Sequence, residues 1–270
     1  MTNNKIPRQL FITGTDTGIG KTVVSAILVS GLNGKYWKPI QSGLEETTDT
    51  QWIQEVTTLP ENHFFPETYR LQRPLSPHAS AVAEGTRINL DIFQLPSTED
   101  YLIVEGAGGI MVPLNETHLM LDLMKKLDIP VLLVARSELG TINHTLLSLE
   151  QMRISGLEVF GVIMNGPRNP VNRESIEHFG NVTVRAEIEY LPEINRRIRL
   201  NGAERSTYQQ LLKFLEEFHR VQGVDPHAVG NTADFKQLIK HHGNSKVPLP
   251  EKFSGGWRQD LLNQFFQPKH

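Results

Sequence analysis

The sequence predicts an α/β protein with a doubly wound, mostly parallel sheet, built as a single domain with a C-terminal appendage. Short apolar runs alternate with longer segments of helical spacing. These runs are apolar throughout, which is typical of strands that helices cover on both faces. From about Val221 the composition becomes rich in Gly, Pro, Asn and His. We therefore assign residues 1–220 to the domain and residues 221–270 to the appendage.

The expected elements follow one another along the chain. The first strand is expected at residues 9–13 and its helix at residues 21–32, where Val24, Ile27 and Leu28 share one face. Further strands are expected at residues 35–38, 101–105, 130–134 and 159–164, with an edge strand at residues 185–191. Further helices are expected at residues 119–127, 141–154, 174–179 and 206–219.

Composition and charge exclude several kinds of function. The chain has no cysteine, which excludes disulfides, cysteine-based zinc sites and a cysteine nucleophile. Its 27 Lys and Arg against 30 Asp and Glu give a net charge of −3, so no overall basic field attracts nucleic acid or anionic lipid. No apolar stretch approaches the ~20 residues of a membrane helix. We expect a cytoplasmic protein without nucleic-acid or membrane partners.

A glycine-rich segment, residues 14–22, lies between the first expected strand and its helix and reads Gly-Thr-Asp-Thr-Gly-Ile-Gly-Lys-Thr. We call it the phosphate loop. Its glycines allow successive N–H groups to face a phosphate, and the helix N-terminus adds its positive end. Lys21 can neutralise phosphate charge, and the Thr22 hydroxyl can bind Mg²⁺. The first glycine stands one position earlier than in the usual motif, but the strand–loop–helix context favours nucleotide binding over a ligand-free turn.

Polar side chains also follow two other expected strands. Lys38 ends the second strand and Ser42 follows in a Pro/Gly turn, so both would face the same crevice as the phosphate loop. Taken alone, Lys38 is better interpreted as a solvated lysine, and Asp49 as a carboxylate at a helix N-terminus. Glu105 comes directly after the apolar run of a buried strand, where an unpaired carboxylate would be costly. This position predicts a cation such as Mg²⁺ nearby.

Five motifs follow one another along the chain. They are the phosphate loop, Lys38-Pro39-x-x-Ser42-Gly43, Leu75-Ser76-Pro77-His78-x-Ser80-Ala81, Glu105-Gly106-Ala107-Gly108-Gly109-x-x-x-Pro113-Leu114 and Leu139-Gly140-Thr141-Ile142-Asn143-His144. The same motifs recur in this order in the dethiobiotin synthase family. The chain resembles this family over roughly its first 190 to 220 residues. The resemblance implies a P-loop NTPase-like fold and a cytosolic homodimer. It also implies that the enzyme uses ATP and Mg²⁺ to close the ureido ring of 7,8-diaminopelargonic acid with CO₂, through a carbamate and a carbamic-phosphoric anhydride.

The resemblance implies roles for individual residues. The implied Mg²⁺ ligands are Thr22, Asp49 and Glu105, and the implied catalytic residues are Lys38, Lys21 and Thr17. The implied nucleotide contacts are Thr15, Asp16, Gly18, Ile19, Gly20, Lys21, Thr22, Val23 and Asn165. The implied substrate contacts are Thr17 and Ser42 for the diamine or its carbamate, and Gly140, Thr141 and Asn143 for the substrate carboxylate across a dimer interface. Without the family, Asn165 is better interpreted as part of an Asn-Gly turn.

Two alternative functions stay open, and the sequence departs from the family's pattern at two positions. A related synthetase of the cobyrinate amidase type shares the loop, but such chains usually append a glutaminase domain with a cysteine nucleophile. A partitioning-type ATPase switch carries a second lysine where this chain has Asp16. Gly18 stands where some members of the family have Glu, and Glu189 where they often have Pro, which leaves base selectivity open.

Overall fold

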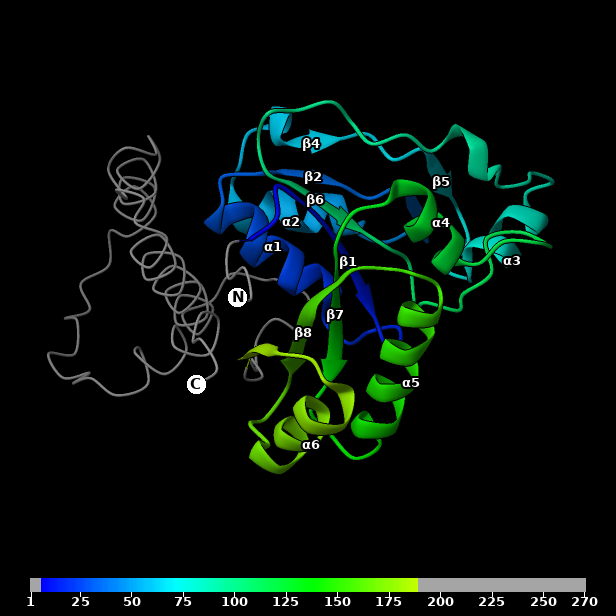
Figure 1. Ribbon diagram of the computed structural model, residues 1–270. Helices are drawn as coiled ribbons and strands as arrows, with labels where there is room; N and C mark the ends of the chain where they lie inside the picture. Colours follow the sequence, from blue (N-terminus) through cyan, green and yellow to red (C-terminus); the bar gives the residue numbers. More distant parts are fainter. Residues whose placement is uncertain (1–5, 189–270) are drawn as a thin grey trace, which may run out of the picture.

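A seven-stranded parallel sheet forms the centre of the structure (Figure 1). The computed structural model describes residues 6–188. In sheet order, the strands are β4 (Phe64–Phe65), β2 (Lys35–Trp37), β6 (Leu102–Glu105), β1 (Gln9–Gly14), β7 (Val131–Arg136), β8 (Val159–Asn165) and β9 (Val184–Ile188). The strands β2, β4 and β6 lie on one side of β1 in the sheet, and β7, β8 and β9 lie on the other side. Ligands of such sheets bind at the carboxyl ends of the strands where the winding reverses.

Helices cover both faces of this sheet. One face packs against α1 (Lys21–Gly31) and α2 (Asp49–Thr57), with a core that includes Leu10 and Ile12 of β1. The other face packs against α4 (Met120–Leu127), α5 (Thr141–Ile154) and α6 (Pro170–Gly180), with a core that includes Phe11. Successive residues of β1 thus enter opposite cores, as the period of two in a strand requires. The expected doubly wound α/β fold is confirmed.

The expected elements that fall on described residues all form. The helix at residues 174–179 is longer than expected, because Asn169 caps its N-terminus and Pro170 occupies the first turn of α6. The expected edge strand corresponds to β9, of which residues 189–191 lie outside the described residues. The expected helix at residues 206–219 and the whole appendage also lie outside them. The domain boundary at residue 220 therefore stays a prediction.

Sequence reasoning missed most of the segment between β2 and β6. There a second, two-stranded parallel sheet joins β3 (Ile40–Ser42) to β5 (Tyr69–Leu71); α2 lies between these strands along the chain, and α3 (Pro77–Ala83) packs against both of them. Strands of two or three residues are too short to show a periodic pattern. The two helices did carry a signal: Thr48 and Gln51 form a capping box, and Ser76 caps a helix that begins with proline.

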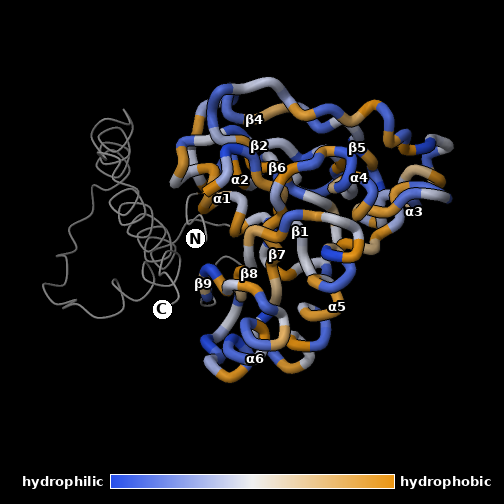
Figure 2. Tube along the Cα trace, viewed as in Figure 1, coloured by the Kyte–Doolittle hydropathy of each residue, from blue (hydrophilic) through white to orange (hydrophobic). Residues whose placement is uncertain are grey.

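The outer helices expose some apolar side chains. Helices α5 and α6 carry both polar and apolar residues around their circumference (Figure 2), with Leu147, Ile154, Val171 and Phe179 exposed. None of the helices within residues 6–188 combines the length and apolar character that crossing a bilayer requires.

Candidate active site

Two glycines and an asparagine determine the shape of the phosphate loop. Gly18 and Gly20 have φ of 71° and 95°, in the left-handed region that side chains disfavour. A Cβ at Gly20 would also collide with the side-chain amide of Asn165. This amide, at the end of β8, donates from Nδ2 to the carbonyl oxygen of Ile19 at 2.8 Å. Asn165 therefore joins the end of β8 to the phosphate loop.

Lys21 crosses the phosphate loop and closes it. Its Nζ donates to the backbone carbonyl oxygen of Asp16 at 2.9 Å. The side chain is buried, and this burial lowers the pKa of Lys21 to about 8 against the opposing effect of the Glu105 charge. A bound anion would replace lost solvation around this ammonium group.

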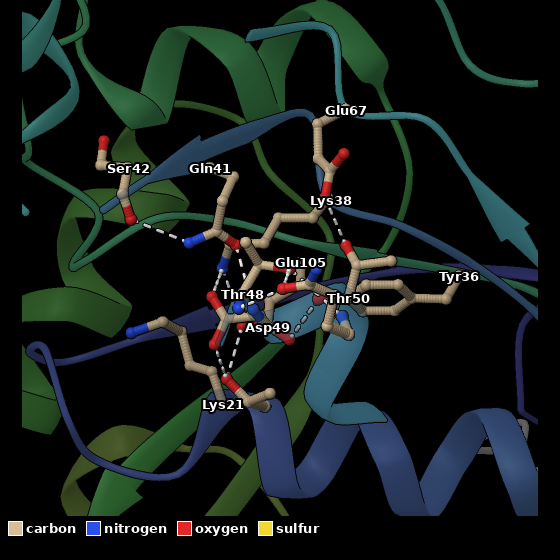
Figure 3. Close-up of polar contacts among 12 residues, drawn as sticks. Lys21, Tyr36, Lys38, Gln41, Ser42, Thr48, Asp49, Thr50, Glu67 and Glu105 are labelled. Atoms are coloured by element: carbon tan, nitrogen blue, oxygen red, sulfur yellow. Dashed lines mark hydrogen bonds and ion pairs between the residues drawn. The ribbon is translucent and has the colours of Figure 1, made fainter. Parts of the chain in front are cut away.

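A cluster of five polar side chains lies beside the phosphate loop, and we call it the Lys38 cluster (Figure 3). Lys38 Nζ contacts Asp49 Oδ2 at 2.6 Å and Glu105 Oε1 at 3.0 Å. The Thr22 hydroxyl is 2.8 Å from Asp49 Oδ1 and 3.0 Å from Glu105 Oε1. The Tyr36 hydroxyl donates to Glu105 Oε2 at 3.0 Å. Residues from β2, α1, α2 and β6 thus meet at the carboxyl edge of the sheet.

Burial gives the Lys38 cluster its electrostatic character. Glu105 is 1% exposed and Lys38 is 4% exposed, so water screens their contact poorly. Burial would lower the pKa of Lys38, but the charges of Glu105 and Asp49 outweigh it and raise that pKa. Burial would raise the pKa of Asp49, but the Lys38 ammonium and the hydrogen bonds from Lys38 and Thr22 lower it. Lys38 contacts both carboxyl groups, and the Lys21 ammonium group also interacts electrostatically with both of them.

The position of Asp49 depends on the helix that it begins. Asp49 is the first residue of α2, directly after the capping residue Thr48. The side chain of Gln41 accepts a hydrogen bond from the Asp49 backbone N–H at 3.2 Å and donates to the Ser42 carbonyl oxygen at 2.8 Å. Asp49 is thus both the helix N-terminal carboxylate that its local sequence indicates and a member of the Lys38 cluster.

The donor set of the Lys38 cluster fits Mg²⁺. This ion prefers oxygen ligands, and proteins usually supply one or two carboxylates while phosphates and water complete the shell. Thr22 Oγ1 lies within hydrogen-bonding distance of both Asp49 Oδ1 and Glu105 Oε1, so three oxygens of this kind gather here. They also adjoin the phosphate loop through Thr22, the second residue of α1.

The other predicted residues of the phosphate loop have different surroundings. The backbone N–H of Thr15 donates to the Val134 carbonyl oxygen at 3.0 Å. The N–H of Thr17 donates to Asp16 Oδ1 at 2.7 Å. Ile19 is buried, and Val23 packs against the core beneath α1. A side chain at Gly109 would touch the backbone of Gly14 and Thr15, so the glycine turn after β6 lies directly against the phosphate loop.

The predicted carboxylate-binding segment lies at the start of α5. Gly140 caps this helix with φ of 93°, and Thr141 Oγ1 donates to the Arg136 carbonyl oxygen at 2.5 Å. Asn143 lines a shallow surface cavity of about 300 Å³ between α5 and α6. Among the described residues, no hydrogen bond or ion pair joins Gly140, Thr141 or Asn143 to the Lys38 cluster.

Sequence reasoning missed three polar residues at this edge of the sheet. Tyr36 and Gln41 support Glu105 and Asp49, and Arg136 forms an ion pair with Asp16 at 2.5 Å between Nη2 and Oδ2. A weak signal existed for Tyr36, because it stands two residues before Lys38 and so points to the same side of the strand. Arg136 directly follows an apolar run, in the same way as Glu105 does.

The chain is similar to known proteins over about two thirds of its length. A family model described as an AAA domain matches residues 8–197. The ATP-dependent dethiobiotin synthetase BioD of Paramagnetospirillum magneticum is 51% identical over 187 residues, which cover 69% of this chain and 90% of that protein. The BioD protein of Brucella ovis is 45% identical over 187 residues, 69% of this chain and 88% of that protein. The biotin biosynthesis bifunctional protein BioCD of Bordetella avium is 50% identical over 190 residues, which cover 70% of this chain and 41% of that protein.

Among solved structures, a ParA family ATPase from Chlorobium tepidum TLS matches with a TM-score of 0.44 and 10% identity, covering 87% of this chain and 98% of that one.

Proposed function

The chain belongs to the family of ATP-dependent dethiobiotin synthetases, ligases of biotin biosynthesis, and we propose that it closes the ureido ring of 7,8-diaminopelargonic acid. The reaction consumes CO₂ and ATP in the presence of Mg²⁺ and yields dethiobiotin, ADP and phosphate. A single observation carries the proposal: the Lys38 cluster adjoins the phosphate loop through Thr22, which belongs to both.

The chemistry proceeds without a covalent enzyme intermediate. One substrate amine adds to CO₂ and loses a proton, which forms a carbamate. A carbamate oxygen attacks the γ-phosphorus of ATP, and ADP leaves from the resulting carbamic-phosphoric anhydride. The second amine then attacks the carbamic carbon, loses its proton and expels phosphate as the five-membered ring closes. The absence of cysteine is compatible with this route.

Catalysis in this proposal consists of positioning and charge stabilisation. Lys21 and Lys38 place ammonium groups beside the phosphate loop, where they oppose the negative charge on the transferred phosphoryl oxygens. Thr22, Asp49 and Glu105 would hold Mg²⁺. When bound, that ion would supply positive charge against the negative charge of the phosphates.

Binding roles are proposed for the remaining residues. Beyond its bond to Ile19, the Asn165 amide has a second N–H and a carbonyl oxygen with which it reads the adenine edge. The buried Ser42 hydroxyl has no partner among residues 6–188, which supports a contact with the diamine or its carbamate, as does Thr17. The start of α5 binds the substrate carboxylate of a partner subunit, in a cytoplasmic homodimer.

The test is a complete reaction with a defined product. The full chain is incubated with 7,8-diaminopelargonic acid, bicarbonate, Mg²⁺ and ATP, and dethiobiotin and ADP are quantified by mass spectrometry. We expect one dethiobiotin for each ADP and no ADP above background when the diamine is omitted. ATP hydrolysis without ring-closed product would refute the proposal.

A further inference from the structure

The phosphate loop contains an acidic residue at a place where phosphate binding disfavours negative charge. Asp16 lies in the loop between β1 and α1, and its carbonyl oxygen accepts the hydrogen bond from Lys21 Nζ. Its carboxylate oxygen Oδ1 accepts a bond from the Thr17 backbone N–H at 2.7 Å. The Asp16 carboxylate is therefore part of the loop's framework, yet it would repel a polyphosphate.

Arg136 compensates this charge from the neighbouring strand. It is the last residue of β7, which pairs with β1 so that Val134 lies beside Gly14. Val134 packs in the core beneath α1, and Arg136, two residues later, points to the same side of the sheet. Its Nη2 lies 2.5 Å from Asp16 Oδ2. One carboxylate thus links the guanidinium group of Arg136 to the backbone of the phosphate loop.

The Arg136–Asp16 pair adds little stability but changes the charge that a nucleotide meets. The two side chains are 34% and 53% exposed, and ion pairs at such sites contribute little to folding. We propose that Arg136 is a positioning residue of the nucleotide site, which neutralises Asp16 and holds the phosphate loop in its binding conformation. This inference rests on the proposed binding of ATP by that loop.

The test measures ATP binding to the full chain by isothermal titration calorimetry in the presence of Mg²⁺. We expect Arg136→Gln to weaken binding on the order of tenfold, because one uncompensated charge then lies near the phosphates. Arg136→Lys keeps the charge and should remain within about threefold of the unmodified chain. Asp16→Asn keeps an acceptor for the Thr17 N–H and removes the repulsion, so it should bind ATP as tightly or more tightly.

The double variant separates charge compensation from a general structural effect. Adding Asp16→Asn to Arg136→Gln should restore affinity to within about twofold of Asp16→Asn alone, since no carboxylate remains to be neutralised. In turnover, Arg136→Gln should raise the KM for ATP and leave kcat within about threefold. The matched control is Arg87→Gln, which breaks an exposed ion pair with Glu116 of 2.8 Å that includes no residue of the phosphate loop and should leave affinity unchanged.

Three outcomes would overturn the inference. They are unchanged affinity in Arg136→Gln, additive losses in the double variant, and a loss of more than tenfold in Asp16→Asn. The Asp16→Asn outcome still tests the inference if Arg136→Gln does not fold, which the absence of a thermal unfolding transition would reveal. If the unmodified chain itself fails to bind ATP, the proposed function fails and the inference with it. If the unmodified chain binds ATP and the variants behave otherwise than expected, only the inference fails.

Discussion

Replacement of Tyr36 by phenylalanine removes a single hydroxyl from the centre of the Lys38 cluster. Tyr36 is fully buried in β2, and its hydroxyl donates to Glu105 Oε2 at 3.0 Å. Burial and the Glu105 charge raise the pKa of this hydroxyl well above its usual value, so it stays protonated as a donor. The phenylalanine ring can keep the edge contact with Phe64, whose centroid lies 6.2 Å away. The variant therefore isolates one hydrogen bond.

The size of the effect follows from the burial of the acceptor. Glu105 is 1% exposed, so water cannot easily replace the lost donor. A hydrogen bond to a charged group contributes about 1.5 to 3 kcal/mol to the free energy of unfolding. For a domain of this size, each kcal/mol shifts the melting temperature by about 2 to 4 °C. We expect Tyr36→Phe to lower it by about 3 to 12 °C.

Thermal melts at one fixed protein concentration measure this shift, because the melting temperature of the proposed homodimer would depend on concentration. Tyr69→Phe is the matched control. The Tyr69 hydroxyl accepts from the Asn89 N–H at 2.8 Å in an exposed setting, where its loss should cost less than about 1 kcal/mol. Equal melting temperatures for the two variants would refute the reasoning that Glu105 depends on Tyr36.

Three further substitutions test the phosphate loop, the α2 cap and the catalytic lysine. Gly20→Ala places a side chain on a residue with φ of 95° and against Asn165. Calorimetry should therefore show ATP binding that is at least tenfold weaker. The control Gly85→Ala changes a residue with φ of 65° that lies in open space, and it should bind ATP normally. Thr48→Ala removes the capping box and should lower the free energy of unfolding in urea by about 1 kcal/mol; an unchanged midpoint and slope would contradict this role. Lys38→Ala should lower kcat for ring closure by more than about 100-fold and weaken ATP binding by less than about tenfold. Comparable losses in both would make Lys38 only a nucleotide ligand.

The long strands were predictable because each is an uninterrupted apolar run. β1, β7 and β8 read directly as strands covered on both faces, and the helices between them show helical spacing. The short strands β3, β4 and β5 were not predictable in this way. Their two or three residues acquire strand geometry from their neighbours in the sheet and not from a local pattern.

The candidate site was predictable only where its residues follow a strand or occupy a motif. Lys38 directly follows β2 and Glu105 is the last residue of β6, and the structure brings them together. Asp49 belongs to the cluster because the first residue of α2 contacts Thr22 of α1 and Lys38 after β2, which no local pattern reveals. The pairing of Arg136 with Asp16 likewise depends on β7 lying next to β1 in the sheet. Contacts across a sheet require the strand order, which a single sequence does not contain.

The position of Lys38 between two carboxylates has a consequence for the binding of Mg²⁺. Its ammonium group already occupies the space between Asp49 and Glu105, so neither carboxylate is left unpaired without a metal. Mg²⁺ that binds at the proposed site must therefore compete with the Lys38 ammonium group for the two carboxylates. This competition with Lys38 weakens the affinity for free Mg²⁺. It favours Mg²⁺ that arrives bound to a nucleotide, because the nucleotide phosphates can then pair with the displaced Lys38 ammonium group.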